Sequence, residues 1–371
     1  MIIEKVDVFR LEQPVSTPTG PASATYKTRR SVLVRLEDGD GITGWGETYA
    51  RAGVTAAIEE LGELLVGRAA RPRPLLDAVR AGMADPLAVS AISIAVDDLR
   101  ARQLGLPLAE LYGGRRRDEV RAYASSGGYR EGVPPEESWP AEVRAAVAAG
   151  FTACKVRIGR FPSGRELPIL EGLRAEVGDG IDLMVDANGA YCVPRAIEVG
   201  RALEALRFRW FEEPLIRHRD GMAYPGYERL AGLDIAIAAG EGLEHRGAFD
   251  AFLTRGAADI VQPDVAICGG IGELLFVAEM AALRGVPCVP HAWGGAVLLA
   301  ATLQAISLLP EPSEVTGVDS PLLELDRFDN PMRTGLSDQS FEVEGGGLVA
   351  IPAGPGLGIT VDEDFVRQTA L

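Results

Sequence analysis

The chain has 371 residues, of which 47% are apolar, with 44 Gly and 24 Pro scattered along it; this predicts a globular protein of one large domain and a smaller companion. Its net charge of −16 argues against nucleic acid or an acidic membrane as partner and favours a small-molecule partner. We see no secretory signal and no apolar run of about 20 residues that could span a membrane, so we expect a cytoplasmic protein.

Residues 1–115 have the pattern of a small α+β unit. Apolar-rich strands are predicted at 2–11, 31–36 and 43–47, with Gly39-Asp40-Gly41 as a hairpin turn before the last of them. Helical periodicity follows at 54–66 and 86–104. The segment 14–30 is rich in Pro, Thr, Gly and Ala, and we expect a mobile loop there.

Residues 116–334 show a different pattern, in which short β-rich runs alternate with helical stretches. The runs recur about 25–30 residues apart, the spacing of βα units in a closed parallel barrel. They lie at 120–125, 153–158, 182–186, 208–212, 235–239, 259–262, 287–290 and 314–318. We therefore predict an α/β fold with a (β/α)₈ barrel, whose closing segment 335–371 returns to the N-terminal unit. An open doubly wound sheet would need a G-x-G-x-x-G turn after its first strand, and Ser125-Ser126-Gly127-Gly128 lacks that order.

Polar and ionisable residues follow every predicted barrel strand after the first. In order along the chain they are Lys155 and Arg157, Asp186 and Asn188, Glu212 and Glu213, Glu241, Gln262 and Asp264, His291, and Asp319. Because the carboxyl ends of barrel strands share one face, these side chains are predicted to form the functional site.

Asp186, Glu212 and Glu241 end three consecutive strands. Three converging carboxylates repel one another unless a cation lies between them, and oxygen ligands favour Mg²⁺ over Zn²⁺. The alternative is that each acid caps a helix, but three in consecutive positions favour the metal. The four cysteines lie far apart without zinc spacing, so we expect buried free thiols.

His291 follows the seventh strand and Asp264 the neighbouring sixth. A carboxylate on one imidazole nitrogen fixes the tautomer and makes the other a general base; the alternative is a histidine bonded only to a loop carbonyl. Lys155 enters the site from the opposite side, as a base or as a fixed charge. Arg157 cannot act as a base near neutral pH. Of the other two histidines, we expect His245 to be solvated and treat His218 as a candidate substrate contact.

Several short motifs follow one another along the chain: Gly44-Trp45-Gly46-Glu47, Leu104-Gly105-Leu106-Pro107, Leu111-Tyr112-Gly113-Gly114, Lys155-Val156-Arg157, Asp186-Ala187-Asn188, Phe211-Glu212-Glu213-Pro214, Gly240-Glu241, Gln262-Pro263-Asp264 and Pro290-His291-Ala292-Trp293-Gly294-Gly295. In this order and spacing they resemble the enolase superfamily, in particular its mandelate racemase subgroup. The resemblance implies Asp186, Glu212 and Glu241 as Mg²⁺ ligands and Asp264 with His291 as the base. The metal would stabilise the enediolate left after loss of the proton next to a carboxylate. Residues 1–115 would cap the barrel, with 14–30 and 48–53 closing over the substrate.

One position departs from the subgroup, which has Lys-x-Lys where this chain has Lys155-Val156-Arg157. A racemase needs a base on each face of the carbon, so Arg157 favours one-sided chemistry through His291: dehydration of a sugar acid or ring-opening of a sugar lactone. The segments 324–331 and 352–358 also resemble members that act on sugar acids. Substrate contacts are then predicted at Arg157, Asn188, Trp293 and Asp319.

The sequence also allows other hypotheses about the function of the chain. A racemase or epimerase could use Lys155 and His291, and a non-catalytic metal-binding barrel is a third hypothesis. The acid of the eighth strand could be Asp319, Glu314 or Glu324. A homo-oligomer is the general expectation.

Overall fold

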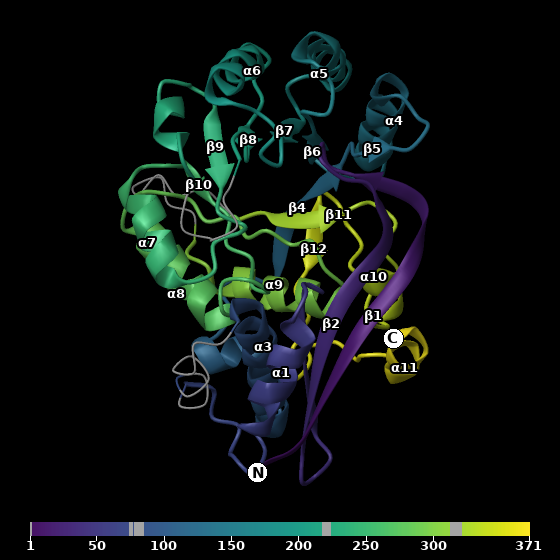
Figure 1. The fold of residues 1–371 in the computed structure, drawn as a ribbon, viewed down its shortest axis with the longest axis vertical. Helices are drawn as coiled ribbons and strands as arrows, with labels where there is room; N and C mark the ends of the chain where they lie inside the picture. Colours follow the sequence, from purple (N-terminus) through teal and green to yellow (C-terminus); the bar gives the residue numbers. More distant parts are fainter. Residues whose placement is uncertain (1, 74–76, 78–84, 217–223, 312–320) are drawn as a thin grey trace.

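The computed structural model describes residues 2–73, 77, 85–216, 224–311 and 321–371. His218, Glu314, Asp319 and the strand predicted at 314–318 therefore lie outside the described residues. The fold combines an antiparallel sheet with a curled parallel sheet (Figure 1).

The antiparallel sheet has the order β3-β2-β1-β5, formed by β1 (Ile3–Gly20), β2 (Tyr26–Asp38), β3 (Thr43–Thr48) and β5 (Tyr129–Arg130). Helices α1 (Val54–Glu63) and α3 (Pro86–Leu104) cover it, close to the predicted bounds. Helix α3 lies so close to β3 that a Cβ on Gly46 would stand 2.0 Å from the Ala91 carbonyl oxygen. The glycines of the Gly44–Glu47 motif thus allow this helix to pack on the strand.

The prediction of a loop at 14–30 is wrong, because β1 extends to Gly20 and β2 begins at Tyr26. The register shifts between Pro14↔Thr28 and Thr19↔Tyr26, so β1 carries extra residues in a bulge at this point. A bulge tolerates proline, which is why this Pro-rich stretch can still be a strand. Figure 1 shows the β1–β2 ribbon running from the N-terminal unit to the barrel.

The parallel sheet has the order β10-β9-β8-β7-β6-β4-β11. Its strands are β4 (Glu119–Ser126), β6 (Ala153–Arg157), β7 (Asp182–Asp186), β8 (Trp210–Glu212), β9 (Ala236–Ala239), β10 (Ile260–Val261) and β11 (Leu323–Asp326). The seventh predicted run joins β10 through the bridges Val261↔Cys288 and Asp264↔His291. Strand β11 pairs with β4 and is the eighth strand segment among the described residues.

An apolar cluster fills the inside of this sheet. Its members are Tyr123, Ala153, Met184, Trp210, Ala238, Ile260, Val289 and Leu322. Val289 and Leu322 belong to the seventh and eighth segments, so side-chain packing closes the curl even though no ladder joins these two segments within the described ranges. These buried side chains pack the inside of the parallel sheet, as expected for a barrel interior.

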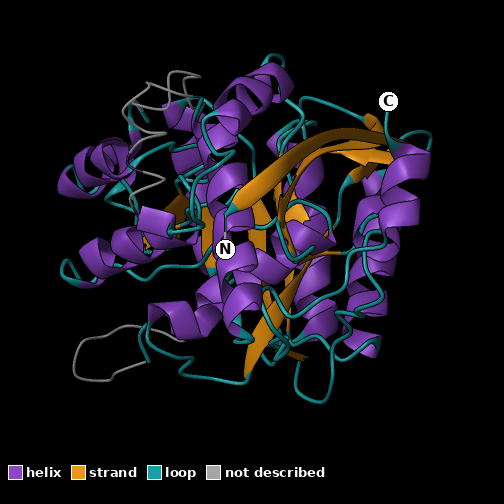
Figure 2. Ribbon diagram, turned by 90° about the horizontal axis from the view of Figure 1, so that it is seen from below, coloured by secondary structure: helices purple, strands orange, loops and turns teal. Residues whose placement is uncertain are grey.

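Helices surround the parallel sheet (Figure 2). They are α4 (Pro135–Ala148), α5 (Ser163–Val177), α6 (Val193–Ala205), α7 (Arg246–Thr254), α8 (Ile271–Ala282) and α9 (Ala296–Leu308), with the short 3₁₀ turns η1 (Leu108–Tyr112) and η2 (Tyr227–Leu230). None of the helices in the described part of the chain is both long and apolar enough to span a membrane. The four cysteines are free as expected, but only Cys154 and Cys268 are fully buried, whereas Cys288 is partly buried and Cys192 is exposed, which corrects the expectation that all four are buried.

The C-terminal part comprises α10 (Pro331–Gly335), β12 (Leu348–Ala350) and α11 (Glu363–Thr369). Strand β12 pairs antiparallel with β4 of the barrel, whereas the Leu371 backbone N–H donates to the Arg10 carbonyl of β1. Buried Asp98 of α3 accepts hydrogen bonds from the backbone N–H groups of Trp45 and Leu357. This carboxylate ties the tail to the N-terminal unit.

Candidate active site

The barrel register places the predicted acids side by side. Arg157 is paired with Asp186 across β6 and β7, and Asp186 is paired with Glu212 across β7 and β8. Glu241 follows β9, the next strand in the sheet. All three acids are buried at the carboxyl ends of their strands. The structure thus gathers them at one face, as the strand-end pattern predicted.

Two cations lie among these acids. Lys155 Nζ is 2.5 Å from Glu212 Oε1 and 2.9 Å from Glu324 Oε1. Burial would lower the pKa of Lys155, but Glu212 and Glu324 outweigh it and raise the pKa well above its usual value. Lys155 is therefore a fixed ammonium in this arrangement.

Arg157 is held from two sides. Its Nη1 donates to Asp186 Oδ2 at 3.1 Å and to Asn188 Oδ1 at 2.6 Å, while its Cζ lies 4.4 Å from the centre of the Trp293 ring. Asn188 has a φ of 44°, a conformation that costs energy in a non-glycine residue and is often kept at functional sites. Three of the predicted substrate contacts, Arg157, Asn188 and Trp293, thus form one cluster.

The acids fit a hard cation in charge and donor type. Burial raises the pKa of Glu212 to about 7, with Lys155 opposing this and Asp186, Glu324 and Glu241 adding to it. Burial also raises the pKa of Asp186 against the effect of Arg157 and Lys155. Further positive charge here would stabilise the ionised acids, and oxygen donors are those Mg²⁺ prefers.

The ligand geometry itself is not formed. Across the described residues, no three His, Cys, Asp or Glu side chains are grouped closely enough to hold a metal ion. Instead Glu212 Oε1 faces Lys155, and Glu212 Oε2 accepts from Trp210 Nε1 at 3.0 Å and from Gln262 Nε2 at 2.8 Å.

The structure brings His291 and Asp264 together as predicted. His291 Nδ1 lies 2.6 Å from Asp264 Oδ2, and His291 Nε2 lies 3.4 Å from Glu241 Oε2. A carboxylate only accepts, so we assign the proton to Nδ1, which leaves Nε2 directed at the acid cluster. Burial would lower the pKa of His291, but Glu241, Glu324 and Asp264 outweigh it and raise the pKa to about 10.

Glu324 is the eighth-strand acid within the described residues. It is fully buried on β11, and its Oε2 lies 3.8 Å from His291 Nε2. Burial would raise the pKa of Glu324, but Lys155 and His291 lower it to about 2. The other histidine that the structure describes, His245, is exposed and caps α7, where its Nδ1 accepts from the Ala248 N–H.

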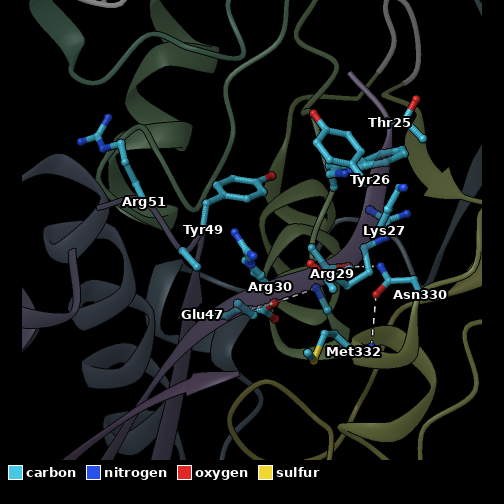
Figure 3. Close-up of a pocket in the computed structure, with 16 residues that line it drawn as sticks. Thr25, Tyr26, Lys27, Arg29, Arg30, Glu47, Tyr49, Arg51, Asn330 and Met332 are labelled. Carbon is cyan, nitrogen blue, oxygen red and sulfur yellow. Dashed lines mark hydrogen bonds between the residues drawn. The ribbon is translucent and has the colours of Figure 1, made fainter. Parts of the chain in front are cut away.

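A cavity of about 640 Å³ lies at the barrel mouth, between the N-terminal unit and the loops that follow the last strands. Figure 3 shows Arg29, Glu47 and Tyr49 beside it. Glu47 is buried and accepts from the N–H groups of Gly295 and Leu298, at the start of α9. Two of the motifs that carried the resemblance, 44–47 and 290–295, therefore meet here.

Sequence reasoning missed two residues of this cavity. Arg29 Nη2 donates to Asp326 Oδ2 at 2.9 Å, and its Cζ lies 4.4 Å from the centre of the Trp293 ring. Tyr49 donates its hydroxyl proton to Asp264 Oδ2 at 2.5 Å. Arg29 lies in the segment 14–30, which was predicted to be a loop. Tyr49 lies in the predicted closing segment 48–53, but no spacing rule distinguished it from its neighbours.

Comparison with known proteins identifies the family. Residues 5–113 match the mandelate racemase/muconate lactonizing enzyme N-terminal domain, and residues 139–365 match the enolase C-terminal domain-like model. The chain is 36% identical to D-galactarolactone cycloisomerase of Agrobacterium fabrum, covering 99% of this chain and 98% of that protein. It is 31% identical to arabinonate dehydratase of Saccharolobus solfataricus, covering 91% and 90%.

Comparison with solved structures gives the same family. The 3,6-anhydro-D-galactonate cycloisomerase of Zobellia galactanivorans superposes with a TM-score of 0.85 at 29% identity, covering 100% of both chains. The L-talarate/galactarate dehydratase of Salmonella typhimurium, liganded with Mg and L-lyxarohydroxamate, gives 0.86 at 26% identity, covering 100% of this chain and 93% of that one. The chain therefore belongs to the mandelate racemase/muconate lactonizing enzyme family and is an enzyme of the enolase superfamily.

Proposed function

We propose that this enzyme removes the proton next to the carboxylate of a sugar acid or sugar lactone and then expels a β-oxygen, as water or as the ring oxygen of the lactone. The observation that carries the proposal is the His291–Asp264 pair, in which His291 Nε2 faces the buried acids Glu241 and Glu324. The named relatives, a D-galactarolactone cycloisomerase and an arabinonate dehydratase, support these two substrate classes.

Asp186, Glu212 and Glu241 would hold Mg²⁺. When bound, the ion would supply positive charge that stabilises the enediolate form of the substrate. Relatives of this fold have been solved with magnesium. The charges of the site support the same assignment, because a His291 whose pKa is about 10 is protonated at neutral pH and cannot accept a proton. Cationic charge beside Glu241 would offset the carboxylates that keep His291 protonated.

In the proposed reaction, His291 Nε2 takes the proton from the α-carbon. Asp264 holds Nδ1 and stabilises the imidazolium that results. The same Nε2–H can then protonate the departing oxygen, so one residue serves both halves of the elimination. Arg157 and Trp293, with Asn188, would contact the substrate.

The chemistry is one-sided in this proposal. Arg157 stays charged between Asp186 and Asn188, and Lys155 is held as an ammonium by Glu212 and Glu324. Neither group is then free to accept a proton. The alternative, a racemase or epimerase, requires Lys155 to lose its proton in the presence of two carboxylates.

The test is incubation of the purified enzyme with Mg²⁺ and a library of aldonates, aldarates and their lactones. We expect a 2-keto-3-deoxy acid from one group of these substrates, detected by semicarbazide absorbance and NMR. The control is His291→Asn, which should abolish the signal. Inversion of a substrate carbon without loss of water or ring-opening would instead support the epimerase.

A further inference from the structure

Tyr49 is the first residue after β3 and reaches from the N-terminal unit into the barrel. Its hydroxyl lies 2.5 Å from Asp264 Oδ2, and the hydroxyl of the preceding Thr48 donates to the Ala266 carbonyl at 2.8 Å. Two adjacent residues of the N-terminal unit thus donate hydrogen bonds to two residues of the barrel, Asp264 and Ala266. Figure 3 shows the Tyr49 ring beside the cavity at the barrel mouth.

Asp264 is fully buried, and its donors determine the plane of its carboxylate. Oδ2 accepts from both Tyr49 and His291 Nδ1, whereas Oδ1 accepts from the Ala266 N–H at 2.7 Å. The terminal torsion of an aspartate is broad, so the carboxylate has little preferred orientation of its own. Three hydrogen bonds to two oxygens fix it, and the imidazole follows the oxygen that it contacts.

Tyr49 is suited to fixing the Asp264 carboxylate because its hydroxyl remains a hydrogen-bond donor. Burial and the neighbouring Asp264 raise the pKa of Tyr49 well above its usual value, so the hydroxyl keeps its proton. A hydroxyl bonded to a carboxylate forms a charge-assisted hydrogen bond, which is stronger than a bond between neutral groups.

We propose that Tyr49 is a positioning residue for the general base: by fixing the Asp264 carboxylate it aims His291 Nε2 at the α-carbon. The orientation of the base then depends on the packing of the N-terminal unit against the barrel. This inference rests on the proposed role of His291 in the reaction.

The first test needs no substrate. The chain has three histidines, so a protein labelled with ¹⁵N-histidine gives a spectrum of three imidazoles, and His291→Asn identifies the signals of His291. We expect Tyr49→Phe to move the Nδ1 resonance of His291 and to speed exchange of its proton with water. The matched control is Tyr112→Phe, which removes an equivalent bond, 2.7 Å from the tyrosine hydroxyl to Asp97 Oδ2, in a contact of η1 with α3. An unchanged His291 signal in Tyr49→Phe would overturn the proposal.

The second test uses the substrate found in the library. Loss of one charge-assisted hydrogen bond should lower kcat about 10- to 100-fold. KM should change less than about twofold, since Tyr49 acts through Asp264. The primary deuterium isotope effect on kcat should rise as proton transfer becomes slower. A wild-type kcat and isotope effect in Tyr49→Phe would overturn the inference alone, whereas an inactive wild-type enzyme would overturn the proposed function.

Discussion

The charge on His291 predicts that the metal-free enzyme loses stability as pH rises above neutral. The folded pKa is about 10 and the ordinary value is 6.5, so the folded state binds a proton more tightly than the unfolded chain. The resulting stabilisation is complete below pH 6.5 and is lost as pH rises toward 10. From this shift, the contribution of His291 is about 3 kcal/mol at pH 7.5 and about 1 kcal/mol at pH 9.5.

This window separates His291 from Glu212, whose raised pKa of about 7 affects stability mainly at lower pH. Urea unfolding in EDTA at pH 7.5 and 9.5 should show a loss of about 2 kcal/mol in the wild type. His291→Asn should remove most of that loss, and Mg²⁺ should reduce it because added cationic charge offsets the carboxylates. Equal pH dependence in the wild type and in His291→Asn would refute the reasoning.

Two further substitutions test other parts of the account. Arg157→Lys puts an ionisable amine on the side opposite His291. During turnover in D₂O, the recovered substrate should then begin to contain its epimer carrying deuterium from the solvent, measured by NMR. An unaltered recovered substrate would mean that Arg157 is not what prevents two-base chemistry. Asp98→Ala removes the carboxylate that accepts from the buried N–H groups of Trp45 and Leu357. The free energy of unfolding should therefore fall by about 2–4 kcal/mol, while kcat stays within about twofold of the wild-type value. An unchanged urea midpoint would contradict the anchoring role of Asp98.

The sequence predicted where several candidate side chains lie, in the places where one rule applied. Polar residues at the ends of regularly spaced strands identified Asp186, Glu212 and Glu241, and the bridge between Asp264 and His291 places that pair in contact as expected. This rule works because parallel strands deliver their carboxyl ends to one face, whatever the intervening helices contain.

The rest depended on contacts that no local pattern encodes. The segment 14–30 forms strands because β2 pairs with β1 on both sides of a bulge, although its proline content is typical of a loop. Strand β11 was not predicted, since its pairing with β4 identifies it rather than the spacing of apolar runs. Tyr49 contacts Asp264 from the other unit, and only the packing of the two units brings its hydroxyl to this carboxylate.

The central claim, one-sided proton abstraction by His291, is tested most directly by turnover in D₂O. NMR and mass spectrometry of a partly converted sugar acid would follow deuterium in both the product and the recovered substrate. We predict deuterated product from the wild type, recovered substrate free of its epimer, and neither product nor exchange from His291→Asn. Deuterium in both epimers of the recovered substrate, or exchange that persists in His291→Asn, would contradict the account.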